Sequence, residues 1–194
     1  RVAFVDDRSG LTYGELDERV RRMAAALRGA GLRREERVLL MMVDGNDWPV
    51  AFLGCLYAGV VPVAVNTLLT ADDYAYMLAH SRSQAALVSG ALLPVLAAAM
   101  DRAPHELRAL VVSRPASGLP AGAVEFGAWL EAQPPLPACA NTLADDIGFW
   151  LYSSGSTGRP KGTVHTPGTL DWTAELSATP VLGLREDDIC FSAA

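Results

Sequence analysis

The chain has 194 residues, a net charge of −6 at pH 7 and an isoelectric point near 5.0. Its basic residues are scattered rather than gathered into a stripe, which excludes nucleic acid as a main partner. Hydrophobic residues make up 51% of the sequence, but Asp44, Asp47, Asp72 and Asp73 bound its richest apolar region, and we expect no membrane span.

Cysteine and histidine usage predicts a cytoplasmic protein without a protein-held metal. The three cysteines are odd in number, lie far apart and form no C-x-x-C pair, which is against a disulfide framework or a zinc site. The three histidines show no metal-ligand spacing either. These six residues are Cys55, Cys139, Cys190, His80, His105 and His165.

The N-terminal region predicts a short strand, Ala3 to Val5, followed by a helix. The sequence shows no signal-peptide pattern, and because the chain begins with Arg1 inside this expected strand, we expect the natural N terminus to lie further upstream. The sequence from Thr12 to Glu15 is a capping box, which starts the helix, and Gly31 ends it. Apolar residues spaced by three and four positions give the helix its buried face: Leu16, Val20, Met23, Leu27 and Ala30.

Strands and helices alternate from Arg37 onward. Strands are expected at Arg37 to Val43, Val60 to Val65, Gln84 to Ser89 and Ala109 to Ser113. Between them we expect a helix from Trp48 to Ala58 capped by Asp47, a helix opened by Thr70 that buries Tyr74, Met77 and Leu78, and a helix from Ala91 to Met100. This alternation predicts an α/β fold, a doubly wound, mostly parallel sheet with helices on both faces. Ligands of such sheets bind at the carboxyl ends of the strands.

The stretch from Arg114 to Asn141 interrupts this alternation and predicts a surface connection around one short helix near Val124 to Ala132. Asp145 and Asp146 are expected to end a loop in water rather than to act as an acid and a base. Near the end of the chain we expect a helix from Thr166 and Pro167 to about Leu176, and a strand at residues 188–192.

The most informative stretch is Ile147 to Gly162, IGFWLYSSGSTGRPKG. Its apolar first half, Ile147 to Tyr152, predicts a buried strand. Hydroxyl-bearing residues, glycines that let the backbone turn and one lysine then follow. These residue types are typical of a loop that binds a polyphosphate. Arg159 and Pro160 stiffen the segment that carries the ammonium group. The candidate site residues are Ser153, Ser154, Gly155, Ser156, Thr157, Gly158, Lys161 and Gly162.

Two other interpretations of this stretch are weaker. A Ser- and Gly-rich segment is typical of a flexible linker, but a linker does not normally leave a hydrophobic strand directly and end in R-P-K-G. A Walker-type P-loop requires G-x-x-x-x-G-K-[ST], and the spacing between Gly155, Gly158 and Lys161 does not meet it.

The segment YSSGSTGRPKG resembles the phosphate-binding signature of the adenylate-forming superfamily, which includes acyl- and aryl-CoA ligases, firefly-type luciferases and peptide-synthetase adenylation domains. The usual pattern has Thr or Ser at Ser153 and Ser156, so this sequence keeps the hydroxyls. The resemblance extends over nearly the whole chain, through LTYGELDERV, VPVAVN and TPVLGLREDDICFSAA. The stretch VNTLLTADDYAYMLAHS is most similar to benzoate-type aryl-CoA ligases.

The resemblance implies an enzyme that joins a carboxylic acid to AMP, using ATP with Mg²⁺ held through the phosphates, and then passes the acyl group to CoA. It implies phosphate contacts from the hydroxyls of the loop and from Lys161. It also implies that residues 1–194 are the N-terminal portion of the large domain, inactive alone, because the catalytic lysine and the acid, adenine and metal contacts follow Ala194. Trp150 and Tyr152 are expected to be core aromatics, and His165 to approach a helix rather than to act as a base.

Three hypotheses follow. The first is an aromatic-acid CoA ligase whose partners are the acid, ATP and CoA, and the sequence leaves a homo-oligomer open. The second is a fatty-acyl-CoA ligase or a peptide-synthetase adenylation domain, which would differ in the acid pocket and in the acceptor. The third is a non-catalytic nucleotide-binding module that has kept the loop.

Overall fold

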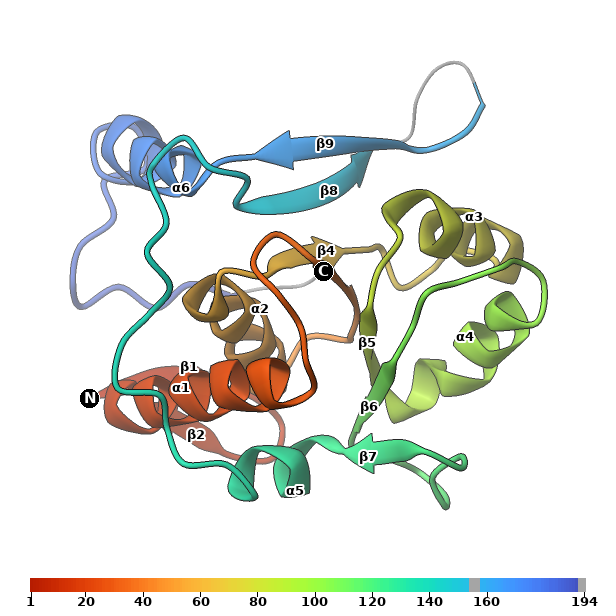
Figure 1. Ribbon diagram of the computed structural model, residues 1–194. Coiled ribbons are helices and arrows are strands. Elements are labelled where there is room, and N and C mark those ends of the chain that lie inside the picture. Colours follow the sequence, from red (N-terminus) through yellow and green to blue (C-terminus); the bar gives the residue numbers. More distant parts are fainter. Residues whose placement is uncertain (154–157, 192–194) are drawn as a thin grey trace.

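The computed structural model describes residues 1–153 and 158–191 (Figure 1). In this part of the chain, seven strands form one sheet in the order β7-β6-β5-β3-β4-β8-β9, and two more form a separate hairpin, β1-β2. The strands are β1 (Val2–Val5), β2 (Gly10–Thr12), β3 (Arg37–Met41), β4 (Val61–Ala64), β5 (Ala85–Ser89), β6 (Ala109–Ser113), β7 (Ala123–Glu125), β8 (Phe149–Ser153) and β9 (Lys161–His165). The helices are α1 (Tyr13–Gly29), α2 (Asp47–Ala58), α3 (Ala71–Ser81), α4 (Leu93–Met100), α5 (Phe126–Glu131) and α6 (Pro167–Thr173), with a 3₁₀ turn at Gly90–Leu92 and a π turn at Ala174–Ala178.

Strand β3 lies at the centre of the sheet and pairs in parallel with β4 and β5. Its side chains alternate between two apolar clusters: Val38 and Leu40 point into one, and Leu39 and Met41 into the other. All four are completely buried. A strand buried on both faces is typical of a parallel sheet covered by helices, and its continuous apolar sequence is the cause.

Helices cover both faces of the sheet (Figure 1). Helices α1, α2 and α5 contribute to the cluster around Val38 and Leu40. Helices α3 and α4 contribute to the cluster around Leu39 and Met41. The pairs β4–β8, β5–β6 and β6–β7 are also parallel, and only β8–β9 is antiparallel among the pairs described in this sheet. The expected doubly wound, mostly parallel α/β fold is therefore confirmed.

Local capping signals place two helices as predicted. Thr12 and Glu15 form a complete capping box at the start of α1. Thr70 and Asp73 form the equivalent box at the start of α3, with the Asp73 carboxylate accepting from the Thr70 backbone N–H at 3.0 Å. Such reciprocal bonds satisfy backbone donors that the first turn of a helix leaves unpaired.

The predicted cap at Asp47 is wrong. Helix α2 already includes Asp47, and the preceding residue, Asn46, makes no capping hydrogen bond through its side chain. The carboxylate of Asp47 instead accepts hydrogen bonds from Arg19 at 2.8 Å and from the Ser113 hydroxyl at 2.7 Å. Charged partners brought close by the fold therefore take the carboxylate away from the helix end, because a charge-assisted bond is stronger than a neutral one.

Four sequence expectations about strands need correction. Strand β7 includes Val124 and Glu125, where the short helix was expected to begin, strand β9 lies where a loop was expected, and described residues 188–191 form no strand. Strand β8 is not buried throughout: Phe149 is buried, whereas Leu151 is 40% exposed. Apolar composition predicts burial only where another element covers the strand: Phe149 packs against Phe52 and His165, whereas Leu151 on the same face is left exposed.

Helices α1 and α2 are in close contact at Gly54. A β-carbon placed there would lie 2.3 Å from Cγ and 2.6 Å from Cβ of Met23. We therefore expect Gly54→Ala to destabilise the fold by about 1–3 kcal/mol through overpacking, as measured by urea unfolding. Gly14→Ala is the matched control, because no atom lies within 4 Å of the added carbon. Equal stability of the two variants would contradict this reading of the helix crossing.

Candidate functional site

The antiparallel hairpin of β8 and β9 carries the candidate phosphate-binding residues that the structure describes. Its register places Ser153 opposite Lys161 and Tyr152 opposite Gly162. Because β8 runs parallel to β4, Ser153 lies at the carboxyl edge of the parallel sheet, where ligands of such folds bind. The candidates Ser154, Gly155, Ser156 and Thr157 lie outside the described residues.

Lys161 offers an uncommitted positive charge at this edge. Its side chain is exposed and forms no ion pair with any residue in the ranges 1–153 and 158–191. It is also the only lysine in the sequence, in which every other cationic side chain apart from the histidines is an arginine. Lysine presents a compact charge that binds a phosphate as a point contact.

Gly158, another candidate residue, has φ +108°, a backbone conformation that favours glycine.

An aromatic group connects the hairpin to helix α3. The hydroxyl of Tyr152 lies 2.8 Å from Nδ1 of His80, and the two share a hydrogen bond. The His80 ring stacks on Tyr76, with ring centroids 5.3 Å apart. The guanidinium of Arg159 lies 5.3 Å from the centroid of the Tyr76 ring. Burial raises the pKa of Tyr152, so its phenol stays protonated at neutral pH and can donate a hydrogen bond.

The sequence analysis did not identify this aromatic group. Tyr152 was expected to be an ordinary core residue, whereas it is half-buried and bonded to His80. The signal available was the spacing of Tyr76 and His80, four residues apart on a predicted helix, which places both rings on one face. His165 does lead into a helix as expected, because it ends β9 next to Thr166 of the α6 cap, and its ring stacks on Phe149 at 4.7 Å.

The expectation that both Asp145 and Asp146 end a loop in water is only partly correct. Asp146 forms an ion pair with Arg34 and accepts a hydrogen bond from the Leu143 backbone N–H at 2.8 Å. Its side chain is 21% exposed. This aspartate therefore joins the segment before β8 to the loop that follows α1, a structural role rather than that of an acid or a base.

A second polar cluster joins the β1–β2 hairpin to the carboxyl ends of β3 and β6. Asp6 forms an ion pair with Arg114, and Arg114 also approaches Asp47 at 3.8 Å. Burial alone would raise the pKa of Asp6, but hydrogen bonds from the Asn46 backbone N–H, from the Arg114 guanidinium and from two further backbone N–H groups hold it well below the ordinary range. The carboxylate is therefore ionised and committed to the fold.

The lowered pKa of Asp6 predicts a loss of stability in acid. A carboxyl with a depressed pKa in the folded state contributes its stability above its unfolded pKa of about 3.9, and this contribution is lost as the pH falls below that value. We expect Asp6→Asn to lower the free energy of unfolding by about 1–3 kcal/mol at pH 7 and to make it less pH-dependent between about pH 5 and 3. Urea unfolding across this range measures both. Asp7→Asn, at a side chain 81% exposed, is the control, and an equal effect there would refute the prediction.

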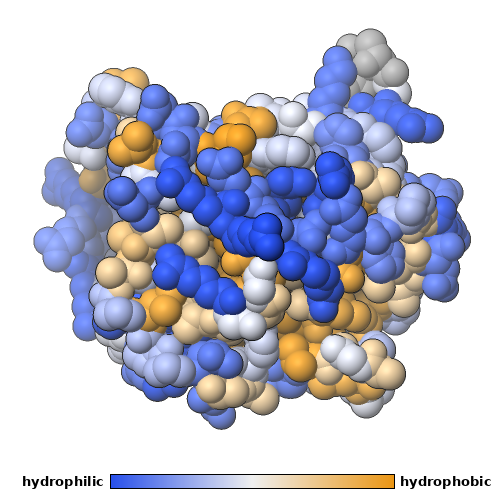
Figure 2. Space-filling model, viewed as in Figure 1, coloured by the Kyte–Doolittle hydropathy of each residue, from blue (hydrophilic) through white to orange (hydrophobic). Residues whose placement is uncertain are grey.

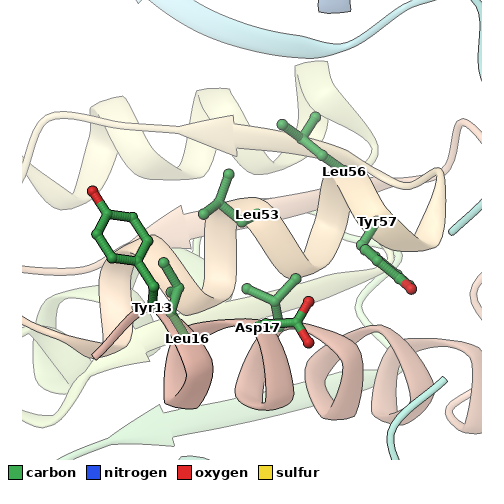
Figure 3. Close-up of a pocket in the computed structure, with 7 residues that line it drawn as sticks. Tyr13, Leu16, Asp17, Leu53, Leu56 and Tyr57 are labelled. Carbon is green, nitrogen blue, oxygen red and sulfur yellow. The ribbon is translucent and has the colours of Figure 1, made fainter. Parts of the chain in front are cut away.

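A surface groove lies between α1 and α2, away from these residues (Figure 3). Its volume is about 400 Å³, and Asp17 is its only charged lining residue. The close-up shows Leu53, Leu56 and Tyr57 on α2 above Tyr13, Leu16 and Asp17 on α1. An apolar groove with one negative charge does not suit a polyphosphate. In Figure 2, by contrast, the surface at the upper right, where the end of the β8–β9 hairpin lies, is hydrophilic.

Neither a metal cluster nor a membrane-spanning helix is found in the described part of the chain. Residues 1–153 and 158–191 contain no group of three or more His, Cys, Asp or Glu side chains that could hold a metal ion. In the same residues, no helix has the length and apolar character needed to cross a membrane.

Comparison with known proteins decides the family. The family model described as AMP-binding enzyme matches residues 1–194. The chain belongs to the AMP-binding enzyme family. This finding agrees with the resemblance of the segment around Ser153 to Lys161 and with the fold.

Within the AMP-binding family, the chain is similar to ligases that act on aromatic acids. It is 48% identical to the benzoate–CoA ligase of Thauera aromatica over all of its length and 36% of that protein. It is 41% identical to a 4-hydroxybenzoate–CoA/benzoate–CoA ligase of Rhodopseudomonas palustris, again over all of this chain and 35% of that protein. The chain thus spans about a third of the length of the curated relatives it matches.

Solved structures of two AMP-binding ligases have the same fold. A benzoate CoA ligase from Burkholderia xenovorans LB400 is 50% identical and superposes with a TM-score of 0.86, over 97% of this chain and 36% of that one. An anthranilate CoA ligase in complex with anthranoyl-AMP is 32% identical, with a TM-score of 0.91 and the same coverage. The doubly wound sheet described above is therefore that of adenylate-forming enzymes.

Proposed function

We propose that this chain is the N-terminal portion of the AMP-binding large domain of a longer, cytoplasmic aromatic-acid CoA ligase. The observation that carries the proposal is its 48% and 50% identity to two benzoate CoA ligases over nearly all of its residues. Substrates of similar chemistry are named for the relatives from Rhodopseudomonas palustris and for the anthranilate ligase. The proposed substrate is accordingly a benzoate-like carboxylate.

The reaction has two steps. A carboxylate oxygen attacks the α-phosphorus of ATP, an acyl-AMP anhydride forms, and pyrophosphate leaves. The CoA thiolate then attacks the acyl carbon, a thioester forms, and AMP leaves. The first step is needed because oxide is a poor leaving group, whereas AMP is a good one. An acyl-AMP of this kind is present in the solved anthranilate ligase.

The hairpin residues contribute to the first step by holding the phosphates. Negative charge grows on the pyrophosphate group as its bond to the α-phosphorus breaks, and fixed donors at that position stabilise the transition state. Lys161 supplies a full positive charge, and Ser153, opposite it in the hairpin, supplies a hydroxyl. The remaining proposed contacts come from Ser154, Ser156 and Thr157 and from the backbone at Gly155, Gly158 and Gly162.

Mg²⁺ is proposed to enter with ATP, bound through its phosphates. The described residues of the hairpin fit this arrangement, because Ser153 and Lys161 supply a neutral hydroxyl and a cation, which suit phosphate oxygens rather than a divalent metal. When bound, the ion would neutralise part of the phosphate charge. CoA is proposed as the acceptor of the acyl group.

A panel of acids assayed with the full-length protein tests the proposed function. We expect benzoate-like acids to support ATP–pyrophosphate exchange and CoA thioester formation with a higher kcat/KM than aliphatic acids. A preference for long aliphatic acids would refute the aromatic assignment in favour of a fatty-acyl-CoA ligase. Acyl transfer to a carrier protein instead of CoA would indicate an adenylation domain, and no exchange with any acid would indicate a non-catalytic module.

A further inference from the structure

The β8–β9 hairpin is joined to the rest of the sheet along a short edge. Its contact with β4 has only two paired positions in the described register, Val63 with Trp150 and Ala64 with Leu151. By comparison, β5 and β6 pair at five positions. Strand β8 continues past β4 at Tyr152 and Ser153, so the end that carries the candidate phosphate contacts lies beyond this backbone pairing. Other contacts must therefore hold that end in place.

Helix α3 supplies these contacts on both sides of residues 154–157. Before this segment, the Tyr152 hydroxyl shares its 2.8 Å hydrogen bond with Nδ1 of His80. After it, the Arg159 guanidinium lies over the ring of Tyr76. Tyr76 and His80 are successive members of one helical face and stack on each other. In Figure 1 the end of β8 and the start of β9 accordingly lie on the side of the sheet where α3 packs.

The contact surface is aromatic and closely fitted. The ring of His80 meets Tyr152 edge-on at 5.8 Å and Trp150 at 6.4 Å between centroids. On the opposite strand, Gly162 lies so close that an added β-carbon would be 3.5 Å from Cε1 of His80. The imidazole therefore touches β8 and directly faces β9. A shift of α3 or of the hairpin would break the Tyr152 hydrogen bond, which is directional, before it broke the stacking contacts.

We propose that Tyr76 and His80 are positioning residues that hold Ser153 and Lys161 in place for the phosphates of ATP. This inference rests on the proposed function of the hairpin. Neither residue touches the nucleotide; each acts through its partner, Arg159 or Tyr152. A donor displaced by an ångström loses most of its benefit to a bound phosphate, since binding and catalysis depend on preorganised geometry.

Two substitutions that remove the same hydrogen bond test the role of His80. In ATP–pyrophosphate exchange by the full-length ligase, Tyr152→Phe and His80→Leu should each raise the KM for ATP about two- to tenfold, the range for one hydrogen bond. The KM for the acid should change less than twofold. The double variant should be no worse than the more affected single variant, because both changes remove one interaction. His80→Asn, which keeps a polar group near Nδ1, should restore part of the ATP affinity.

Tyr76→Leu should raise the KM for ATP about two- to fivefold through loss of the cation–π contact. Tyr13→Phe and His105→Leu are the matched controls, since both residues are exposed and neither contacts the hairpin. A merely structural role would move the KM values for ATP and acid together and lower the melting temperature. Tyr152→Phe removes a single oxygen atom, so we expect this variant to fold normally.

The results separate this inference from the proposed function. If Lys161→Ala weakens the reaction with ATP but Tyr152→Phe and His80→Leu do not raise the KM for ATP, the positioning role is wrong and the ligase assignment stands. If Lys161→Ala also has no effect, the phosphate-binding role of the hairpin is wrong. Equal changes in the KM for acid and for ATP, or additive effects in the double variant, also overturn the positioning role.

Discussion

Lys161→Ala should slow adenylation by the full-length ligase about tenfold to a thousandfold, the range for one lost transition-state contact. The ammonium group is exposed at the carboxyl edge of the sheet and has no carboxylate partner among the residues the structure describes. Its charge is therefore available to the leaving pyrophosphate. Single-turnover formation of acyl-AMP measures the effect on this step directly.

Two observations control this experiment. Lys161→Arg keeps the positive charge but changes its geometry, so it should retain more activity than the alanine variant. Reaction of synthetic acyl-AMP with CoA should be much less affected, because pyrophosphate has already left. If Lys161→Ala forms acyl-AMP at the normal rate, or if it slows both half-reactions equally, the proposed phosphate contact is wrong.

Leu40→Ala should destabilise the protein by about 2–5 kcal/mol. Leu40 is completely buried at the centre of the sheet, where β3 pairs with strands on both sides. Removing its branched side chain leaves a cavity that the paired backbones cannot close. Urea unfolding measures the loss.

Leu68→Ala is the control for this substitution. Leu68 is 89% exposed, so the same chemical change should alter stability by less than about 0.5 kcal/mol. Similar losses at the two positions would show that β3 does not form the centre of the folded core.

Elements with strong local signals were predictable from the sequence. The two capping boxes set the starts of α1 and α3, and the apolar stretch around Leu40 set a strand buried on both faces. Each signal lies within a few residues of the feature that it predicts. The doubly wound arrangement followed from the alternation of such elements.

Features that depend on distant residues could not be predicted in the same way. Strand β9 forms because β8 supplies a partner, although Lys161 and Gly162 have little β propensity. Asp47 has the chemistry of a helix cap, but Arg19 and Ser113 are brought to it by the fold. The contact of His80 with Tyr152 joins residues 72 positions apart.

The same difference between local and distant signals applies to the candidate site. The residue types proposed to bind phosphate could be read from a contiguous segment, because hydroxyls, glycines and a cation occur there within a few positions of one another. The groups that hold this segment lie on α3 and on its own flanking residues. The contact between Tyr76 and Arg159 is made by the fold and has no signal in the local sequence.

The backbone pairing of β8 with β9 fixes the positions of two candidate phosphate-binding residues independently of the residues that link the strands. Ser153 and Lys161 stand opposite each other because the strands pair, whatever side chains occur at positions 154–157. Substitutions at those four positions should therefore change the affinity for the triphosphate group, which all nucleoside triphosphates share, while the spacing of Ser153 and Lys161 is preserved. This short segment is thus a compact target for tuning the proposed triphosphate affinity without changing the register of the two strands.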